Sequence, residues 1–130
     1  MTLTTPTLHD QAKAANTASR RLAATSTEVK NAALIAIAEA IEASRESILR
    51  TNEQDLEAAK RDNIDFQLLE RMTLNNARVK AMADAARDIA ALEDPIGEIL
   101  EKRVLPNGLD LERIRVPLGV IGVIYESRPN

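Results

Sequence analysis

The sequence of 130 residues contains no cysteine and very few aromatic side chains. Without cysteine, the chain itself offers no disulfide framework, no cysteine-based zinc site and no thiol nucleophile. Phe66 and Tyr125 are its only aromatic residues, so it lacks the platform on which proteins stack nucleic-acid bases. Its formal net charge of −3 is also of the wrong sign for binding a phosphate backbone. We therefore expect no nucleic-acid partner.

Long hydrophobic runs are absent as well. No stretch approaches the roughly 18 consecutive apolar residues of a membrane span, and the N-terminal MTLTTPTLHDQAK lacks the features of a secretory signal. The single histidine, His9, is expected to be exposed and not a metal ligand. A hydrophobic content of 45% is nevertheless typical of a folded protein. We expect a cytoplasmic globular protein without membrane contact and without a metal.

Glycine and proline are missing between Pro6 and Pro95, and this interval is rich in alanine. Such a composition predicts helices, because alanine loses no rotamer entropy and nothing interrupts the backbone ladder. We expect three or four of them, including one from about Glu28 to Leu49 and one from about Leu8 to Ala24. The first has an apolar stripe at helical spacing, made of Leu34, Ile37, Ala38, Ile41 and Ile48.

Three polar residues are expected to begin helices. Thr25 and Glu28 have the spacing of a capping box, in which each side chain bonds to the backbone of the other residue. Asn52, three residues before Asp55, predicts a second start, and Thr73 predicts a third.

After Pro95 the pattern changes to strands and turns. Residues 98–105 and 109–116 flank Pro106-Asn107-Gly108, and Asn-Gly predicts a hairpin with a type I′ turn. Both flanking segments are rich in charge, in Glu101, Lys102, Arg103, Asp110, Glu112, Arg113 and Arg115. We therefore expect either a solvated surface hairpin or a contact with another subunit.

The segment from Gly119 to Tyr125 is apolar at nearly every position, which is typical of a parallel strand covered on both faces. Such a strand requires a crossover and a partner, and the sequence contains no second strand of this kind. Gly119-Val120-Ile121-Gly122 lies inside this predicted strand instead of opening a helix, so it is not a dinucleotide fingerprint. We expect an α/β fold that is incomplete in this chain.

The last residues, RVPLGVIGVIYESRPN, closely resemble the stretch that begins the nucleotide-binding sheet in the γ-glutamyl phosphate reductase family. AALIAIAEAIEA, ILRTNEQDLEAAKRD and MTLNNARVKAMADAARDIAALEDPIGEIL are similar to its earlier segments. The resemblance implies an aldehyde-dehydrogenase-like α/β fold. Residues 1–97 would be the helical part of a cofactor-binding domain, residues 98–117 a β-hairpin oligomerisation arm, and residues 118–130 the first strand of a parallel nucleotide-binding sheet.

The resemblance also implies an activity. The family, also called glutamate-5-semialdehyde dehydrogenase, uses NADPH to reduce L-glutamyl 5-phosphate to L-glutamate 5-semialdehyde and phosphate in proline biosynthesis. A homo-oligomer that contacts the upstream glutamate kinase is implied too. A cysteine thiolate attacks the acyl phosphate in this chemistry. Since the chain has no cysteine, the nucleophile is expected downstream of Asn130, and the chain alone is expected to be inactive.

Four residues at the end of the chain match the family's site. The resemblance implies that Asn130 donates its amide to the oxyanion, that Glu126 and Ser127 bind the nicotinamide end of the cofactor, and that Arg128 meets the substrate phosphate or carboxylate. Judged on residue type alone, Asn130 is rather a helix N-cap. Arg128 is equally well read as a solvated residue paired with Glu126.

Two other readings remain open. The chain could be a non-catalytic module of helices and a β-ribbon that acts in assembly, or a truncated paralogue of the enzyme. It could also belong to another aldehyde dehydrogenase with an ordinary aldehyde substrate. An assembly module would be monodisperse and melt cooperatively by itself, whereas an enzyme segment would expose the apolar edge of residues 120–125 and self-associate.

Overall fold

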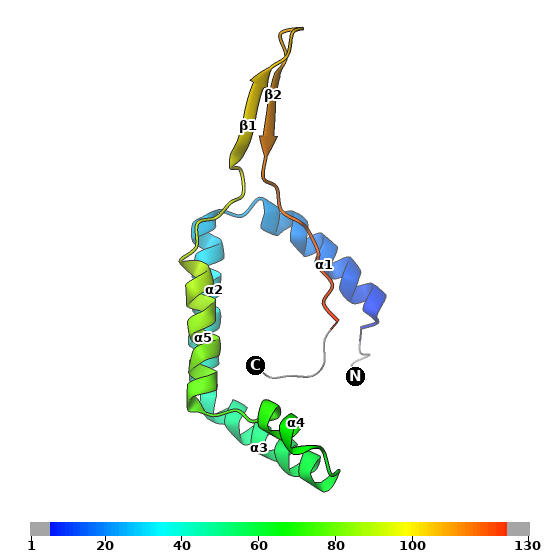
Figure 1. Ribbon diagram of the computed structural model, residues 1–130, viewed down its shortest axis with the longest axis vertical. Coiled ribbons are helices and arrows are strands. Elements are labelled where there is room, and N and C mark those ends of the chain that lie inside the picture. Colours follow the sequence, from blue (N-terminus) through cyan, green and yellow to red (C-terminus); the bar gives the residue numbers. More distant parts are fainter. Residues whose placement is uncertain (1–5, 125–130) are drawn as a thin grey trace, which may run out of the picture. The chain divides into compact units, whose positions relative to one another are not determined.

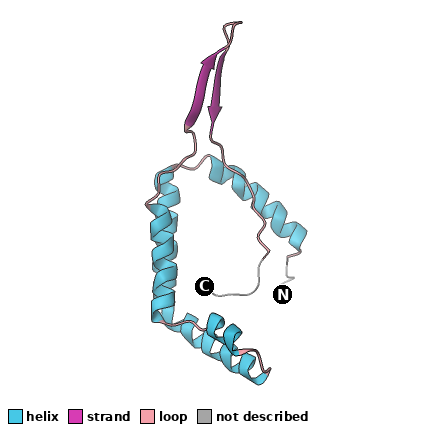
Figure 2. Ribbon diagram, viewed as in Figure 1, coloured by secondary structure: helices cyan, strands magenta, loops and turns pink. Residues whose placement is uncertain are grey.

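The computed structural model describes residues 6–124, which form five helices and one two-stranded sheet (Figure 1, Figure 2). In chain order these are α1 (Leu8–Ala23), α2 (Thr27–Ala43), α3 (Arg45–Arg61), α4 (Phe66–Met72), α5 (Asn76–Ala90), β1 (Ile99–Val104) and β2 (Asp110–Ile114). The contacts divide them into two units. The helical unit comprises residues 27–92 together with residue 124, and the ribbon unit comprises residues 6–26 and 93–123.

The core of the helical unit forms where α2 and α5 lie side by side (Figure 1). Ala38 of α2 and both Val79 and Ala83 of α5 are completely buried, and Ala59 of α3 is nearly so. Three of these four side chains are alanines, so the helices approach closely but bury little apolar area. Among the described residues Val79 is the largest fully buried side chain. The core of this unit is therefore small.

The helix predicted from Glu28 to Leu49 is divided in two. Its first part, α2, ends at Ala43, and α3 begins at Arg45. Ser44 still donates its N–H to the carbonyl of Ala40, but its ψ of 2° leaves the helical range. Serine has a low helix propensity because its hydroxyl competes for backbone groups, which favours a break at this position. The apolar spacing continues across residue 44, so the sequence pattern does not reveal this break.

The predicted apolar stripe is confirmed in part. Leu34, Ala38, Ile41 and Ile48 are buried or half-buried. Ile37, however, is 51% exposed, because it lies to the side of the face that packs on α5.

The helix predicted from about Leu8 to Ala24 is confirmed by α1. It begins with a capping box: the Asp10 N–H donates to the Thr7 hydroxyl over 3.2 Å, and the Thr7 N–H donates to the Asp10 carboxylate over 3.2 Å. In this capping box aspartate takes the place of the usual glutamate or glutamine. The predicted capping box of Thr25 and Glu28 stays a prediction. The Thr25 hydroxyl donates to the Arg21 carbonyl at the end of α1, and α2 begins at Thr27.

Asn52 does not begin a helix, as predicted, but lies in the middle of α3. Its side chain is 8% exposed and makes two hydrogen bonds of 2.8 Å to the segment that links α4 to α5. The Asn52 amide donates to the Met72 carbonyl, and its oxygen accepts from the Leu74 N–H. The side-chain amide of Asn52 thus bonds to the backbone as a neighbouring strand would, with one donor and one acceptor. These two bonds hold the linking segment against α3.

The prediction that Thr73 begins a helix is also wrong, because Thr73 ends α4. The cap of α5 is Asn75, whose side chain accepts from the Arg78 N–H over 2.9 Å. Asp65 caps α4 in the same way.

The predicted hairpin is confirmed, but its turn is of another type. β1 and β2 pair antiparallel, with Lys102 opposite Glu112. A type I′ turn would require an N–H at Pro106, which proline lacks. Instead the Leu105 carbonyl accepts from the Gly108 N–H, and the Leu105 N–H donates to the Leu109 carbonyl. Gly108 has a φ of +83°, so the loop has three residues and a glycine in the left-handed region.

Residues 119–124 form no strand in the structure, although the sequence predicts one there. The sheet of the described residues consists of β1 and β2, and a further strand has no partner among them. Leu118 and Ile124 are almost completely exposed as a result. Tyr125, the last residue of the predicted strand, lies outside the described residues.

The buried bridge made by Asn52 predicts a large effect of Asn52→Ala on stability. The substitution leaves the Met72 carbonyl and the Leu74 N–H without partners in a partly buried place, and we expect a loss of about 1–3 kcal/mol. The free energy of unfolding in urea, followed by circular dichroism, measures it. Glu53→Ala, on the exposed side of α3, is the matched control and should change stability by less than about 0.5 kcal/mol. Equal losses in the two variants would contradict the bridge.

Candidate functional site

The four predicted site residues lie outside the part of the chain that the structure describes. They are Glu126, Ser127, Arg128 and Asn130. Their roles therefore stay predictions.

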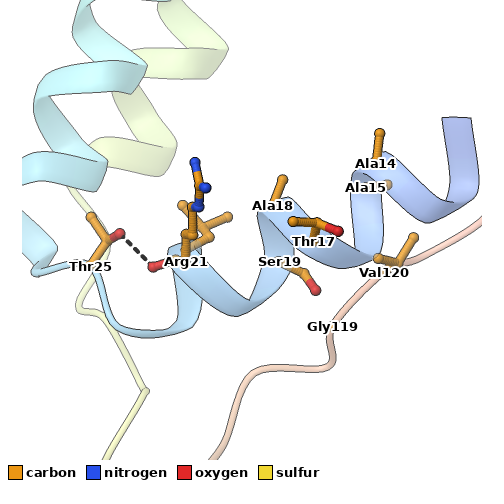
Figure 3. Close-up of a pocket in the computed structure, with 10 residues that line it drawn as sticks. Ala14, Ala15, Thr17, Ala18, Ser19, Arg21, Thr25, Gly119 and Val120 are labelled. Atoms are coloured by element: carbon orange, nitrogen blue, oxygen red, sulfur yellow. Dashed lines mark hydrogen bonds between the residues drawn. The ribbon is translucent and has the colours of Figure 1, made fainter.

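A surface hollow of about 790 Å³ lies in the ribbon unit, between α1 and the segment at Gly119 (Figure 3). Its lining is mostly apolar and consists of Ala14, Ala15, Thr17, Ala18, Ser19, Arg21, Leu22, Thr25, Gly119 and Val120. Alanines on α1 leave the space, because a larger side chain at these positions would fill it. The hollow is thus made by the N-terminal helix and the glycine-containing segment together.

The chemistry of this hollow does not fit a dinucleotide. Phosphate groups are bound by backbone N–H groups of a glycine-rich turn that opens a helix, whereas Gly119 and Gly122 lie in an irregular segment. The Thr25 hydroxyl donates to the Arg21 carbonyl over 2.9 Å. Arg21 is the one charged residue in the lining. The surface suits an apolar neighbour better than a phosphate or a nicotinamide.

A second hollow, of about 360 Å³, lies beside the start of α3 in the helical unit. It is lined by Ser44, Ser47, Ile48, Thr51, Asn52, Asp55 and Leu74. Asp55 is its only carboxylate, so it has no pair of carboxylates for acid–base catalysis. Asn52 is occupied by its two backbone partners. Across residues 6–124, no group of three or more histidine, aspartate or glutamate side chains could hold a metal ion.

A bidentate ion pair joins α2 to α5. The two terminal guanidinium nitrogens of Arg87 donate to the carboxylate of Glu42, over 2.6 and 3.2 Å. Arg87 also contacts Asp84 over 3.1 Å, and Asp84 pairs with Lys80 one turn earlier. Each of these side chains keeps about a third or more of its surface exposed. The group therefore orients the two helices and is not a buried reactive centre.

The pKa values of this cluster follow from its contacts. The hydrogen bond from Arg87 lowers the pKa of the Glu42 carboxyl, and the bond from Lys80 lowers the pKa of Asp84. The hydrogen bond to Glu42 raises the pKa of Arg87. All three shifts favour the charged forms, which is typical of a structural ion pair.

The described residues thus provide a framework without a reactive centre. They contain no nucleophile–base pair, no metal site and no fitting cofactor site. No helix between residues 6 and 124 is long and apolar enough to cross a membrane.

No protein-family model matches the sequence. Two solved reductases have the same fold in part of their chains. One, from Thermotoga maritima, has a TM-score of 0.80 and 34% identity over 85% of this chain and 27% of its own. The other, from Saccharomyces cerevisiae, has a TM-score of 0.78 and 31% identity over 87% of this chain and 29% of its own. The mixed helical fold with a small antiparallel sheet is therefore that of a segment of a larger reductase.

The solved structures and the curated relatives named here carry the same name. Both structures are of γ-glutamyl phosphate reductases. The curated γ-glutamyl phosphate reductases of Proteus mirabilis and Syntrophomonas wolfei are 50% and 51% identical to this chain over 95% of its length. The chain spans only about 30% of these relatives. It is homologous to the N-terminal segment of γ-glutamyl phosphate reductases.

The Glu42–Arg87 pair predicts a loss of stability at low pH. The pKa of Glu42 is lower in the folded than in the unfolded chain, where it is about 4.3. The contribution of the pair is therefore complete above that value and disappears as the pH falls through the folded-state pKa. Urea unfolding measured between neutral and acidic pH should show a shallower decline for Glu42→Gln. A profile that coincides with that of Glu53→Gln, the matched loss of a surface carboxylate, would contradict the pair.

Proposed function

We propose that the chain functions as part of a γ-glutamyl phosphate reductase, an NADPH-dependent enzyme of proline biosynthesis in the cytoplasm. The reaction would convert L-glutamyl 5-phosphate to L-glutamate 5-semialdehyde and phosphate. One observation carries the proposal: relatives of this name are 45–51% identical to the chain over 92–95% of its length. The TM-score of 0.80 to a solved enzyme of this name supports it.

The chain would contribute framework and part of the site, while the nucleophile comes from elsewhere in the enzyme. A thiolate must attack the acyl phosphate and expel phosphate, and the chain has no cysteine. We therefore expect the cysteine in the two thirds of the enzyme that this chain does not cover. NADPH, when bound, supplies the hydride for the reduction.

Asn130 is the residue of this chain for which we propose a direct role. Its amide N–H would donate to the oxyanion that develops on the substrate carbonyl, without titrating itself. Arg128 would hold the phosphate or carboxylate of the substrate through its planar guanidinium. Glu126 and Ser127 would lie beside the nicotinamide. These proposals depend on the match of ESRPN to the family.

We further propose three structural parts in the complete enzyme. Residues 1–97 are the helical part of the cofactor-binding domain, and residues 118–130 become the first strand of its parallel sheet. The exposure of Val120 and Ile121 in the isolated segment agrees with a strand that lacks its partners. Residues 98–117 form an arm through which subunits of a homo-oligomer contact one another. The enzyme also contacts the glutamate kinase that acts before it in the pathway.

The role of Asn130 predicts a strong effect on catalysis in the enzyme that contains this segment. Loss of one oxyanion donor in Asn130→Ala should lower kcat by about 10²- to 10³-fold. NADPH oxidation with glutamyl phosphate, generated by a glutamate kinase in the same assay, measures the rate. Asn16→Ala, on the exposed side of α1, is the matched control and should retain full activity. An undiminished rate in Asn130→Ala would leave Asn130 as a helix cap.

The proposed arm predicts that its apolar side chains support assembly. Leu111 of β2 is 44% exposed in the hairpin, and a charge there would have to be desolvated in a subunit contact. We expect Leu111→Glu to give a smaller assembly in light scattering after size exclusion. Leu8→Glu, at an 82% exposed position of α1, should leave the mass unchanged. If both variants keep the wild-type mass, the hairpin is an ordinary solvated ribbon.

A further inference from the structure

Asn107, at the tip of the hairpin, has a side-chain amide in an unusually open place. Of the eight asparagines in the sequence, it is the only one that is followed by glycine. Both Asn107 and Gly108 are exposed. Among the described residues, no heavy atom beyond the two neighbours of Gly108 lies within 4 Å of the place where its Cβ would stand. No side chain therefore covers the backbone nitrogen that follows Asn107.

The side chain of Asn107 is folded toward this nitrogen. Its Oδ1 accepts a hydrogen bond from the Leu109 N–H over 3.2 Å, as in an Asx turn. The ring that this bond closes contains both the Cγ of Asn107 and the backbone nitrogen of Gly108, so the two atoms stay near one another. The bond also withdraws electron density from Cγ. The arrangement thus favours attack of the Gly108 nitrogen on Cγ.

One contact opposes this attack. The Gly108 N–H donates to the Leu105 carbonyl over 2.9 Å, and it must leave this partner before its nitrogen can react. The bond closes a loop whose three residues, 106–108, are all exposed. Exposed turns open at a low cost in free energy, because few buried contacts are lost with them. The turn bond therefore slows the attack but does not prevent it.

We propose that Asn107 deamidates spontaneously, which makes the hairpin tip a site of covalent modification. The Gly108 nitrogen forms a bond to Cγ and loses its proton, while the Cγ–Nδ2 bond breaks and ammonia leaves with that proton. A cyclic succinimide results. Water then adds to either of its two carbonyls and opens the ring to aspartate or to isoaspartate, and neither an oxidant nor a reductant is required. The proposal does not depend on the reaction proposed for the enzyme.

Isoaspartate changes the backbone of the loop. Its main chain runs through Cβ and Cγ, so one atom is added between residues 107 and 108. A loop of three residues cannot accommodate this atom and keep the bond from the Leu105 N–H to the Leu109 carbonyl, of 2.8 Å, unchanged. The new carboxylate also adds a negative charge near Asp110, in a chain whose formal net charge is already −3. We expect the tip to loosen as the protein ages.

Asn63 is a matched control within the same polypeptide. It is exposed as well, and the N–H of Ile64, which follows it, also donates to a turn carbonyl, that of Ala59, over 3.0 Å. The two sites differ in the residue after the asparagine. Ile64 is β-branched, so its bulky side chain hinders the approach of its nitrogen to the side-chain amide. A difference in rate between the two asparagines therefore measures the effect of Gly108.

The first test follows the unaltered protein, in its complete form, by peptide mapping during incubation in warm neutral buffer. Cleavage after arginine gives peptide 104–113 with Asn107 and peptide 62–71 with Asn63. Conversion of an amide to a carboxylic acid adds about 1 Da. We expect this gain at least about tenfold faster in peptide 104–113, which corresponds to a barrier lower by about 1.4 kcal/mol. Equal rates, after correction with a sample digested without incubation, would overturn the proposal.

The second test examines the product and its effect on the loop. Fragmentation by electron transfer should find isoaspartate at position 107, and hydrogen exchange at the Leu105 amide should be faster in the incubated protein than in the fresh one. Asn107→Ser keeps a residue that favours turns and should retain both its mass and its exchange rate. A mass gain of peptide 104–113 in this variant would overturn the assignment to Asn107. Unchanged exchange in incubated wild-type protein would contradict the loosening.

Discussion

The close contact of α2 with α5 is the interaction on which the helical unit depends. Ala38 and Ala83 are completely buried and carry almost no side chain, so the two helices can approach closely around Val79. The Glu42–Arg87 pair holds them in one orientation at their more exposed margin. α3 and α4 are then joined to this pair by Asn52 and by the linking segment at Leu74. Small side chains and a few polar bridges replace the large apolar core of an ordinary domain.

Because the core consists mainly of small side chains, many larger apolar side chains of the segment stay exposed. Val29 and Ile37 on α2, and Val120 and Ile121 near the end, are at least about half exposed. The curated relatives are more than three times as long as this chain. The hairpin also exposes apolar side chains, among them Val104 and Leu111, but it combines them with ion pairs. Its Lys102–Glu112 and Arg115–Glu98 pairs, of 2.8 and 2.7 Å, satisfy one another across the ribbon.

Helix existence was predictable from composition, but helix boundaries were not. An alanine-rich interval without glycine or proline favours helix wherever it occurs. Asn52 and Thr73 were expected to begin helices, because asparagine and threonine are common caps. In the folded chain Asn52 finds carbonyl and N–H partners twenty residues away, and Asn75 caps α5 instead of Thr73. A polar side chain can serve either purpose, and only its spatial neighbours decide between them.

The sequence by itself determined the helical and ribbon parts, the hairpin and the likeness to γ-glutamyl phosphate reductases, because these depend on local composition and on residue identity. It also excluded a cysteine nucleophile from this chain. The tertiary structure decided which side of α2 is buried, how Asn52 is used and that residues 119–124 form no strand without partners. Packing and strand pairing join residues that are distant along the chain, and their outcome depends on which partners are present.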